Sequence, residues 1–226
     1  MSWSLLDLQN QIANEMDQSA TAPSQGGTDW NIRLNSLNRA QIDWAESYDW
    51  EVLKKVHNGI VSTSTNNASI SLPATFRKLD GFPKITYDGT NTEDFTPVDF
   101  TKNSQYTTGD KIANILGNNT DGKVLYIPFV ELTSGASVQF PYWSSPVSLA
   151  SATDITPCPD PTYIVQRALY YLYKGREDGR FPEAKVESEK IMARMIEQEN
   201  VLGQAHSDNR VSNWNTTRYG YRIGRD

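Results

Sequence analysis

The sequence contains few of the residues that carry covalent or metal chemistry. Its single cysteine, Cys158, has no partner for an internal disulfide, so the fold must be stabilised by packing alone. Its two histidines, His57 and His206, have no cysteine, histidine or acidic cluster at metal-ligand spacing, which argues against a zinc site. Neither a glycine-rich phosphate loop nor a Gly-x-Ser-x-Gly elbow is present. These absences predict a chain that is not an enzyme and that binds no cofactor and no metal ion.

Long apolar runs and an excess of positive charge are also missing. No stretch approaches the ~20 apolar residues that a bilayer span requires, and residues 1–16 mix polar and acidic side chains where a signal peptide needs an apolar core. We therefore expect a soluble protein that is made in the cytoplasm and has no membrane partner. The 21 basic and 27 acidic residues give a net charge of −6, which argues against a free-standing nucleic-acid-binding protein.

Helical periodicity marks the N-terminal part of the chain. A short amphipathic helix is expected after Ser4, which stands three residues before Asp7 as in a capping box. After a small, polar loop at residues 20–29, a second helix is expected to start near Asp29. Apolar residues then recur at steps of three and four up to Asn58, which predicts about seven turns at ~3.6 residues per turn. This stripe consists of Leu34, Leu37, Ala40, Trp44, Tyr48, Val52, Leu53 and Val56.

The middle of the chain changes to a period of two. Short alternating segments around Ile70, Ile85 and Val138 predict strands, and prolines keep these strands short or at sheet edges. We expect an antiparallel β module with an irregular loop near residues 88–123. The polar segment 91–119 within it has no role that the sequence reveals.

Helical periodicity returns near the C-terminus. Asp160-Pro161 is a favourable start for a third helix, and residues 174–179 break it. Phe181-Pro182 opens a fourth helix that is expected to end near Leu202-Gly203, so the two helices should form an antiparallel hairpin. The sequence thus predicts an α+β fold: an antiparallel helical body of about four helices, an inserted β-rich module and an extended C-terminal arm. The predicted parts are 1–58 (N-terminal helices), 59–159 (β-rich module), 160–203 (helix hairpin) and 204–226 (arm).

The arm has neither helical nor strand periodicity, but it is rich in arginine and aromatic residues. These side chains are typical of interface hot spots, so the composition predicts an arm that becomes ordered on a partner, with an ordinary flexible terminus as the alternative. The predicted binding residues of the arm are Arg210, Trp214, Arg218, Tyr219, Tyr221, Arg222 and Arg225.

Two acidic pairs and one aromatic run deserve a second interpretation. Glu93-Asp94 and Glu177-Asp178 could serve as the paired carboxylates of a glycosidase, but both lie in polar stretches where solvated acids are the norm. The run Phe140, Tyr142 and Trp143 could line a sugar-binding face, but it also fits a half-buried strand. We expect solvated acids in the first case and core or interface packing in the second.

Three blocks of the sequence resemble the head-to-tail adaptor proteins of tailed phages. Residues 33–53, RLNSLNRAQIDWAESYDWEVL, are similar to a helix with the pattern LN-A--D-----DW--L. Residues 70–85 contain a Leu-Pro-x-x-Phe-Arg-x-Leu element. Residues 140–195 resemble a strand, a Pro-x-x-Leu segment, an Asp and a proline-rich entry to a helix hairpin; the matching residues are Pro146, Leu149, Asp154, Pro157 and Pro161.

This resemblance implies a structural virion protein of the neck, between capsid and tail. Twelve copies would form a ring below the portal protein, with the helices as the ring body, the β module on the side of the tail or nozzle proteins, and the arm entering the portal. Genomic DNA would pass through the lumen during ejection without specific binding, and an acidic lumen suits such a conduit. A tail terminator or gatekeeper ring is the first alternative, and a carbohydrate-binding tail module is the second. The tail type and the host stay open.

Overall fold

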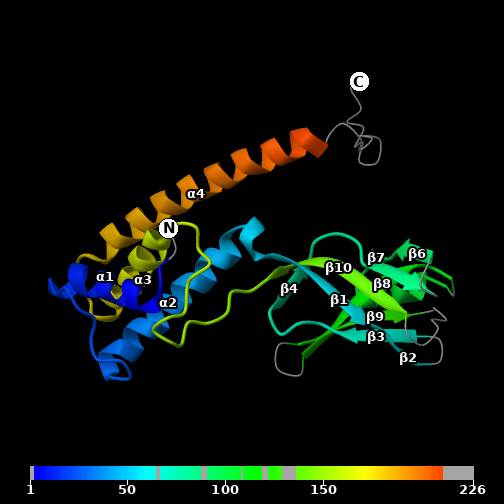
Figure 1. Cartoon of the computed structure of the whole chain (residues 1–226), viewed down its shortest axis with the longest axis horizontal. Coiled ribbons are helices and arrows are strands. Elements are labelled where there is room, and N and C mark those ends of the chain that lie inside the picture. Colours follow the sequence, from blue (N-terminus) through cyan, green and yellow to red (C-terminus); the bar gives the residue numbers. More distant parts are fainter. Residues whose placement is uncertain are drawn as a thin grey trace. The chain divides into compact units, whose positions relative to one another are not determined.

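The computed structural model describes residues 3–64, 67–87, 91–107, 109–118, 122–128 and 136–210 (Figure 1). The chain is mixed α+β and divides into two compact units. The first unit consists of Met1–Trp44 and Leu149–Asp226 and is helical, whereas the second consists of Ala45–Ser148 and contains the strands. The β-rich unit is therefore inserted between two segments of the helical unit.

Helix α1 (Leu5–Asp17) has the predicted capping box at its start. The backbone N–H of Ser4 donates to Asp7 Oδ2 at 2.9 Å, and the backbone N–H of Asp7 donates to Ser4 Oγ at 3.2 Å. The hydrogen bonds from the Ser4 hydroxyl and backbone N–H lower the pKa of Asp7. The cap thus fixes the point where the helix begins.

Helix α2 (Thr28–Ser47) begins one residue before the predicted start but ends about three turns earlier than predicted. A single turn of 3₁₀ helix (Glu51–Leu53) and strand β1 (Lys54–Ile60) follow it. The predicted continuation of the helical stripe is wrong because Val52 and Val56 are 54% and 58% exposed. Seven residue pairs join β1 to another strand, and this pairing overrides the local helical period.

Helices α3 (Pro161–Gly175) and α4 (Phe181–Arg210) form the predicted hairpin, and α3 also packs against α1. The Asp160 carboxylate caps α3 by accepting from the Thr162 N–H at 3.1 Å. The predicted end of α4 near Leu202-Gly203 is wrong, since the helix continues to Arg210. Gly203 costs only about 1 kcal/mol relative to alanine inside a helix, which is too little to stop it.

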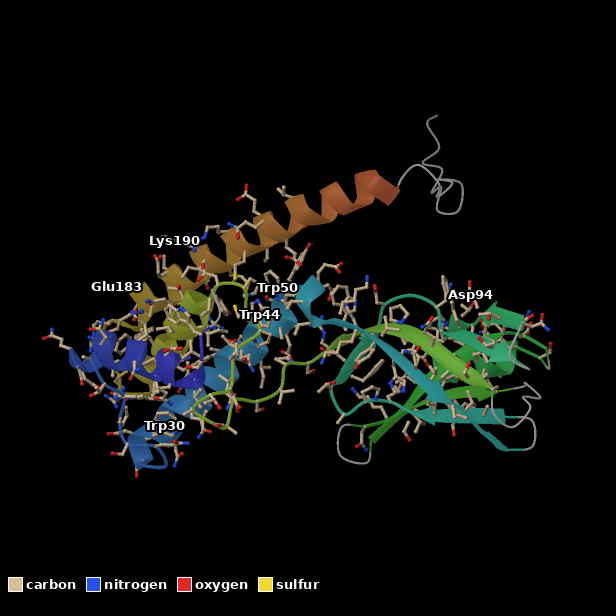
Figure 2. The ribbon with its side chains drawn as sticks, in the orientation of Figure 1. Trp30, Trp44, Trp50, Asp94, Glu183 and Lys190 are labelled. Carbon is tan, nitrogen blue, oxygen red and sulfur yellow. The ribbon has the colours of Figure 1, made fainter. Side chains whose placement is uncertain are left out.

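The core of the helical unit is made from one apolar stripe of each helix. Trp30 and Trp44 of α2 are buried within it (Figure 2). Its large buried side chains include Leu5, Leu8, Ile12, Trp30, Leu37, Trp44, Ile164, Leu169, Leu172, Ile191 and Met195. The expectation that the second, third and fourth helices share one packed body is therefore confirmed for these positions.

The second unit contains two five-stranded sheets. The first has the order β1–β10–β5–β6, with β4 paired to β10 as well. Its strands after β1 are β4 (Phe76–Leu79), β5 (Lys84–Tyr87), β6 (Asn91–Asp94) and β10 (Ser137–Ser144). The second has the order β2–β3–β9–β8–β7. Its strands are β2 (Ser62–Ser64), β3 (Asn67–Ser71), β7 (Thr96–Pro97), β8 (Ile112–Asn118) and β9 (Gly122–Pro128).

One hydrophobic core joins the two sheets. Phe76, Ile85 and Phe140 of the first sheet and Ile70 and Leu125 of the second belong to it. The sheets approach closely at Gly59 of β1, where an added Cβ would lie 2.3 Å from Ile70 Cδ1. A side chain at this position would force the end of the Ile70 side chain to move.

The segment predicted as an irregular loop near residues 88–123 is more regular than expected. It contains β6, β7, β8 and a 3₁₀ helix, Phe100–Gln105. Phe95 is fully buried, and buried Asn114 donates to the Val98 carbonyl at 2.8 Å. The β7–β8 pair is parallel, so the module is not wholly antiparallel as predicted. Isolated buried residues such as these leave no periodic pattern in the sequence.

Candidate interaction surfaces

The predicted binding arm lies almost entirely outside the described residues. Its first seven residues, 204–210, continue helix α4. Of the predicted binding residues, only Arg210 falls within the described backbone, at the end of that helix. The other six, Trp214, Arg218, Tyr219, Tyr221, Arg222 and Arg225, lie outside the described residues. Their role in binding stays a prediction.

Helix α4 continues beyond Met195, the last buried side chain described on it. At a rise of about 1.5 Å per residue, the fifteen residues from Ile196 to Arg210 span about 22 Å. Among them, the apolar side chain of Val201 is 61% exposed. The described side chains of residues 196–201 are therefore a candidate contact surface.

Several polar residues of the pattern at residues 33–53 make contacts that begin on α2. Asn38 donates to the Leu149 carbonyl at 3.0 Å and accepts from the Leu149 N–H at 2.7 Å. Asp43 accepts from Arg167 Nε at 2.6 Å and from the Tyr171 hydroxyl. Both contacts join the first resemblance block to the third. Polar side chains of the first block thus bind the backbone and side chains of the third in the folded chain.

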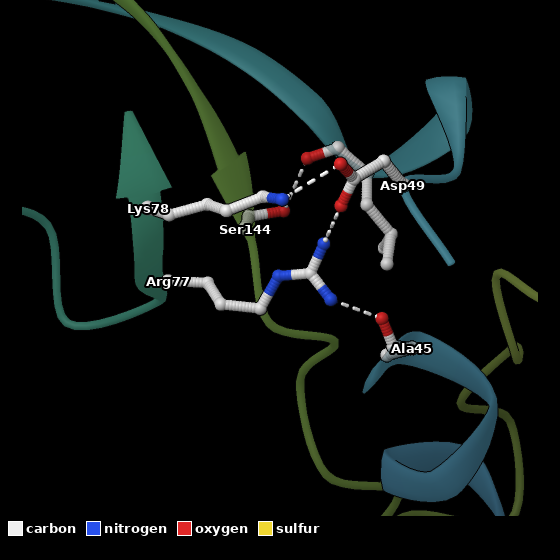
Figure 3. A network of polar contacts seen from close by, with 6 residues as sticks. Ala45, Asp49, Arg77, Lys78 and Ser144 are labelled. Atoms are coloured by element: carbon white, nitrogen blue, oxygen red, sulfur yellow. Dashed lines mark hydrogen bonds and ion pairs between the residues drawn. The ribbon is translucent and has the colours of Figure 1, made fainter. Parts of the chain in front are cut away.

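Asp49, the second aspartate of the same pattern, binds two residues of the second block. Asp49 accepts from Arg77 of β4 at 2.7 Å through Oδ1 and from Lys78 at 2.7 Å through Oδ2 (Figure 3). Arg77 also donates to the Ala45 carbonyl, one of the last four carbonyls of α2. That helix has no basic residue in its last turn, so Arg77 supplies the positive charge that stabilises a helix C-terminus. The arginine of the Leu-Pro-x-x-Phe-Arg-x-Leu element thus has a structural task.

Substitution of Arg77 tests this task. Arg77→Ala is expected to lower the free energy of unfolding of the second unit by about 1.5–3 kcal/mol, because it removes two charge-assisted hydrogen bonds from a side chain that is 19% exposed. Lys78→Ala is the matched control, since it removes an exposed partner of the same acid and should cost less than about 1 kcal/mol. Urea unfolding measures both. Equal losses in the two variants would show that the bond to the helix end contributes nothing.

The third block contains a turn that precedes the helix hairpin in the chain. The Asp154 carboxylate accepts from the backbone N–H groups of Ala150 and Ser151, each at 2.8 Å. The bonds from Ser151 and Ala150 lower the pKa of Asp154. The Asp154 carbonyl accepts from the Leu5 N–H at 2.7 Å, so this turn also holds the start of α1.

A basic-aromatic groove between α2 and α3 was not predicted from the sequence. Arg39 lies 4.0 Å from the Tyr171 ring centre, Arg167 lies 5.1 Å from that of Tyr170, and Lys174 borders the same groove. Partial burial and the hydrogen bond to Asp43 raise the pKa of Tyr171. The spacing of Arg167, Tyr171 and Lys174 at i, i+4 and i+7 is the signal that could have revealed it. Its charge suits an acidic partner.

One member of each acidic pair has a structural partner within the described residues. Glu93 forms an ion pair with Lys111 at 2.5 Å, and Asp178 forms one with Arg180 at 2.7 Å. The bonds that Arg180 donates lower the pKa of Asp178, whereas a general acid needs a raised one. The Glu93-Asp94 pair lies in the second unit and Glu177-Asp178 in the first. Among the described residues, no three His, Cys, Asp or Glu side chains form a metal-ion cluster.

The aromatic run and the chemically reactive side chains are also accounted for in the described part of the chain. Phe140 and Tyr142 belong to the core of the second unit, and Trp143 is 6% exposed beneath Lys54, which confirms the core interpretation of this run. His57 of β1 lies 5.2 Å from Phe140, ring centre to ring centre. Burial raises the pKa of the Cys158 thiol and makes it unreactive.

Comparison with protein families identifies the chain. The family model described as SU10 adaptor protein matches residues 3–218, which is nearly the full length. The chain belongs to the SU10 adaptor family. This confirms the resemblance to phage head-to-tail adaptor proteins, and it makes the chain a structural protein of a bacteriophage, a component of the virion that associates with other head and tail proteins. Comparison with curated proteins gives no match.

Two further observations bear on this SU10 adaptor. None of its described helices is long and apolar enough to span a bilayer. The polar contacts described above connect the parts of the chain that carry the resemblance. Among the described residues, the basic-aromatic groove and residues 196–201 of α4 are its candidate contact surfaces.

Proposed function

We propose that this SU10 adaptor protein forms a homo-oligomeric ring of twelve copies below the portal, joins the capsid to the tail and lines the DNA conduit. The observation that carries the proposal is the match of the adaptor family over residues 3–218, which includes both compact units and half of the predicted arm beyond α4. Val201 of α4 supports it, because an exposed apolar side chain on a helix suits a contact in an assembled particle.

The charge distribution supports the same function. Residues 204–226 carry a net charge of +2, so the remaining 203 residues carry −8. An acidic body suits a conduit that DNA passes without sticking, and a basic arm suits an acidic pocket on the portal. The proposed protein partners are therefore the portal protein, tail or nozzle proteins, and further copies of the chain. Genomic DNA passes through the ring without specific binding.

Electron microscopy of the full chain together with the portal of the same phage tests this proposal. The expected result is a closed twelve-fold ring in contact with the portal. A ring that binds the tail tube and ignores the portal would favour the alternative of a tail terminator or gatekeeper. Absence of any ring, together with retention on immobilised glycans that Trp143→Ala abolishes, would favour the carbohydrate-binding tail module.

The proposal assigns the chain no catalytic role. Glu93 and Asp178 already form ion pairs with basic neighbours, as expected of structural acids. Turnover of a polysaccharide, peptide or nucleotide that disappears in Glu93→Gln or Glu177→Gln would contradict this assignment.

A further inference from the structure

The first sheet of the second unit has two edges that no other strand covers. Strand β1 lies at one edge and β6 at the other, and within the described residues neither pairs with a strand beyond the sheet. An uncovered edge exposes backbone N–H and C=O groups and is a template for another strand. Every open sheet has two such edges, and natural proteins normally protect them, so an edge that lacks protection is a candidate site for pairing with another strand.

The β1 edge is long and partly apolar. It runs for seven residues without a proline, and Val56 and Ile60 on it are 58% and 73% exposed. Edge charges protect a strand against further pairing, and on β1 they are confined to Lys54 and Lys55 at its start; residues 56–60 include no Lys, Arg, Asp or Glu. The edge therefore has the properties of a surface that becomes covered.

The two edges carry opposite charges. Strand β1 begins with Lys54 and Lys55, and β6 ends with Glu93 and Asp94; Figure 2 labels Asp94 on this strand. Within the described residues, Lys55 and Asp94 have no ion-pair partner. A basic edge and an acidic edge on the same sheet are complementary to one another in two different copies of the chain.

The direction of the strands allows this pairing. All neighbours in the order β1–β10–β5–β6 are antiparallel, so β1 and β6 run in opposite directions. Copies related by rotation about a ring axis therefore place β6 of one copy antiparallel to β1 of the next. Such a contact uses two different surfaces, which is the kind of contact that builds a ring.

The faces of the strands select one register. The His57 ring packs on Phe140 of the core, so Lys55 and His57 point to the core side of the sheet and Lys54 points to the other side. Glu93 stands opposite buried Ile85, so it also points to the core side, and Asp94 points away from it. Pairing Lys54 with Asp94 and Lys55 with Glu93 thus places each opposite-charge pair on one face.

This register also sets the offset between successive strands, the stagger, to a value found in known closed sheets. Within one copy, Asn58 of β1 pairs with Gln139 of β10, Gln139 pairs with Lys84 of β5, and Lys84 pairs with Asp94 of β6. Asn58 and Asp94 therefore lie at the same height in the sheet. The pairing of Lys54 with Asp94 is therefore offset by about four residues over four strands. About one residue per strand is the stagger of closed eight-stranded sheets with a shear of eight.

We propose that β1 of one copy adds to β6 of the next copy in this register, so that the first sheets form a continuous antiparallel belt around the ring. The inference rests on the proposed ring and names the surface that closes it. Lys54 already pairs with Asp80 and Glu93 with Lys111, each at 2.5 Å. The added contacts extend these pairs into rows of alternating charge, and Val56 meets Thr92 of the neighbouring copy.

A pair of cysteines at Val56 and Thr92 tests the register. These positions are directly opposite in the proposed pairing and share a face, whereas in one subunit three strand spacings, about 14 Å, separate them. The native Cys158 is buried and does not interfere. Rings of V56C/T92C assembled with the portal are oxidised mildly and analysed on a non-reducing gel.

A covalent ladder beyond the dimer is the expected result. Either single variant can give at most dimers, because a subunit with one new cysteine has one link. The control pair V56C/N91C has its cysteines on opposite faces and should give no ladder. Rings of V56C/T92C that show no ladder overturn the belt but leave the proposed function standing, whereas a native chain that forms no ring overturns both.

A charge exchange provides an independent readout. Lys55→Glu should raise the concentration for half-assembly of the ring about tenfold or more, because it places two acids opposite each other. Adding Glu93→Lys on the same chain should restore most of the assembly, since the pair is rebuilt with reversed charges. Unchanged assembly of Lys55→Glu, or no recovery in a double variant that folds normally by circular dichroism, would count against the belt.

Discussion

Deletion of residues 211–226 is expected to leave a folded subunit that no longer attaches to DNA-filled heads. The truncation point follows Arg210, the last residue of α4, so the helical unit keeps all of its described elements. The deleted segment contains Arg218, Tyr221 and four further predicted binding residues. Arginines form planar bidentate hydrogen bonds with carboxylates, and aromatic side chains fill pockets at little entropic cost.

Occupancy of the variant on isolated heads, measured by quantitative gel analysis, checks this result. A second variant, Arg218→Ala with Tyr221→Ala, should weaken attachment about tenfold or more, with a larger loss at high salt. Arg176→Ala, an exposed arginine just after α3, is the matched control and should attach normally. Full occupancy of the truncated chain on the portal would show that the arm is dispensable.

Leu172→Ala is expected to cost about 2–5 kcal/mol of the free energy of unfolding of the helical unit. Leu172 is 4% exposed on α3, and removal of a large side chain from such a site loses its transfer free energy and leaves a cavity. Leu169→Ala, at a site that is 1% exposed, should cost a similar amount. Denaturant unfolding followed by circular dichroism measures both.

Val201→Ala provides the comparison for these variants. This residue is 61% exposed on α4, so its truncation should change the stability of the isolated subunit by less than about 0.5 kcal/mol. A near-zero cost at both Leu169 and Leu172 would mean that this face of α3 is not part of the core. A cost at Val201 that appears only in the assembled particle would mark α4 as an assembly surface.

The features that the sequence predicted well are those with a strong local signal. The capping box at Ser4, the Asp160-Pro161 start of α3 and the Phe181 start of α4 are each determined by a few neighbouring residues. The alternation around Ile85 likewise marked a true strand, because one face of it is buried. Local rules suffice where the residues that contact one another are also close in sequence.

The errors arose where distant residues decide the structure. Tyr48 and Val52 continue the helical period of α2, but the helix ends earlier because β1 pairs with β10, whose paired residues lie 77 to 89 positions further along the chain. The groove around Arg39 and Arg167 depends on the same kind of contact, between residues far apart in the chain. The two free strand edges could not be seen before the strand order was known, since a sequence does not show which strands are outermost.

The insertion of one unit into the other has a consequence for synthesis on the ribosome. Helices α1 and α2 emerge first, but α3, which completes their core, follows only after the ~100 residues of the second unit, about 5–20 s later at ~5–20 residues per second. The contacts available to the two helices during that interval include those of Gln9 with the Trp30 carbonyl and of Arg33 with Asp17. The β-rich unit, although made later, can complete its core first. A chaperone would bind the nascent helices, on which Leu8, Ile12 and Trp44 are still uncovered.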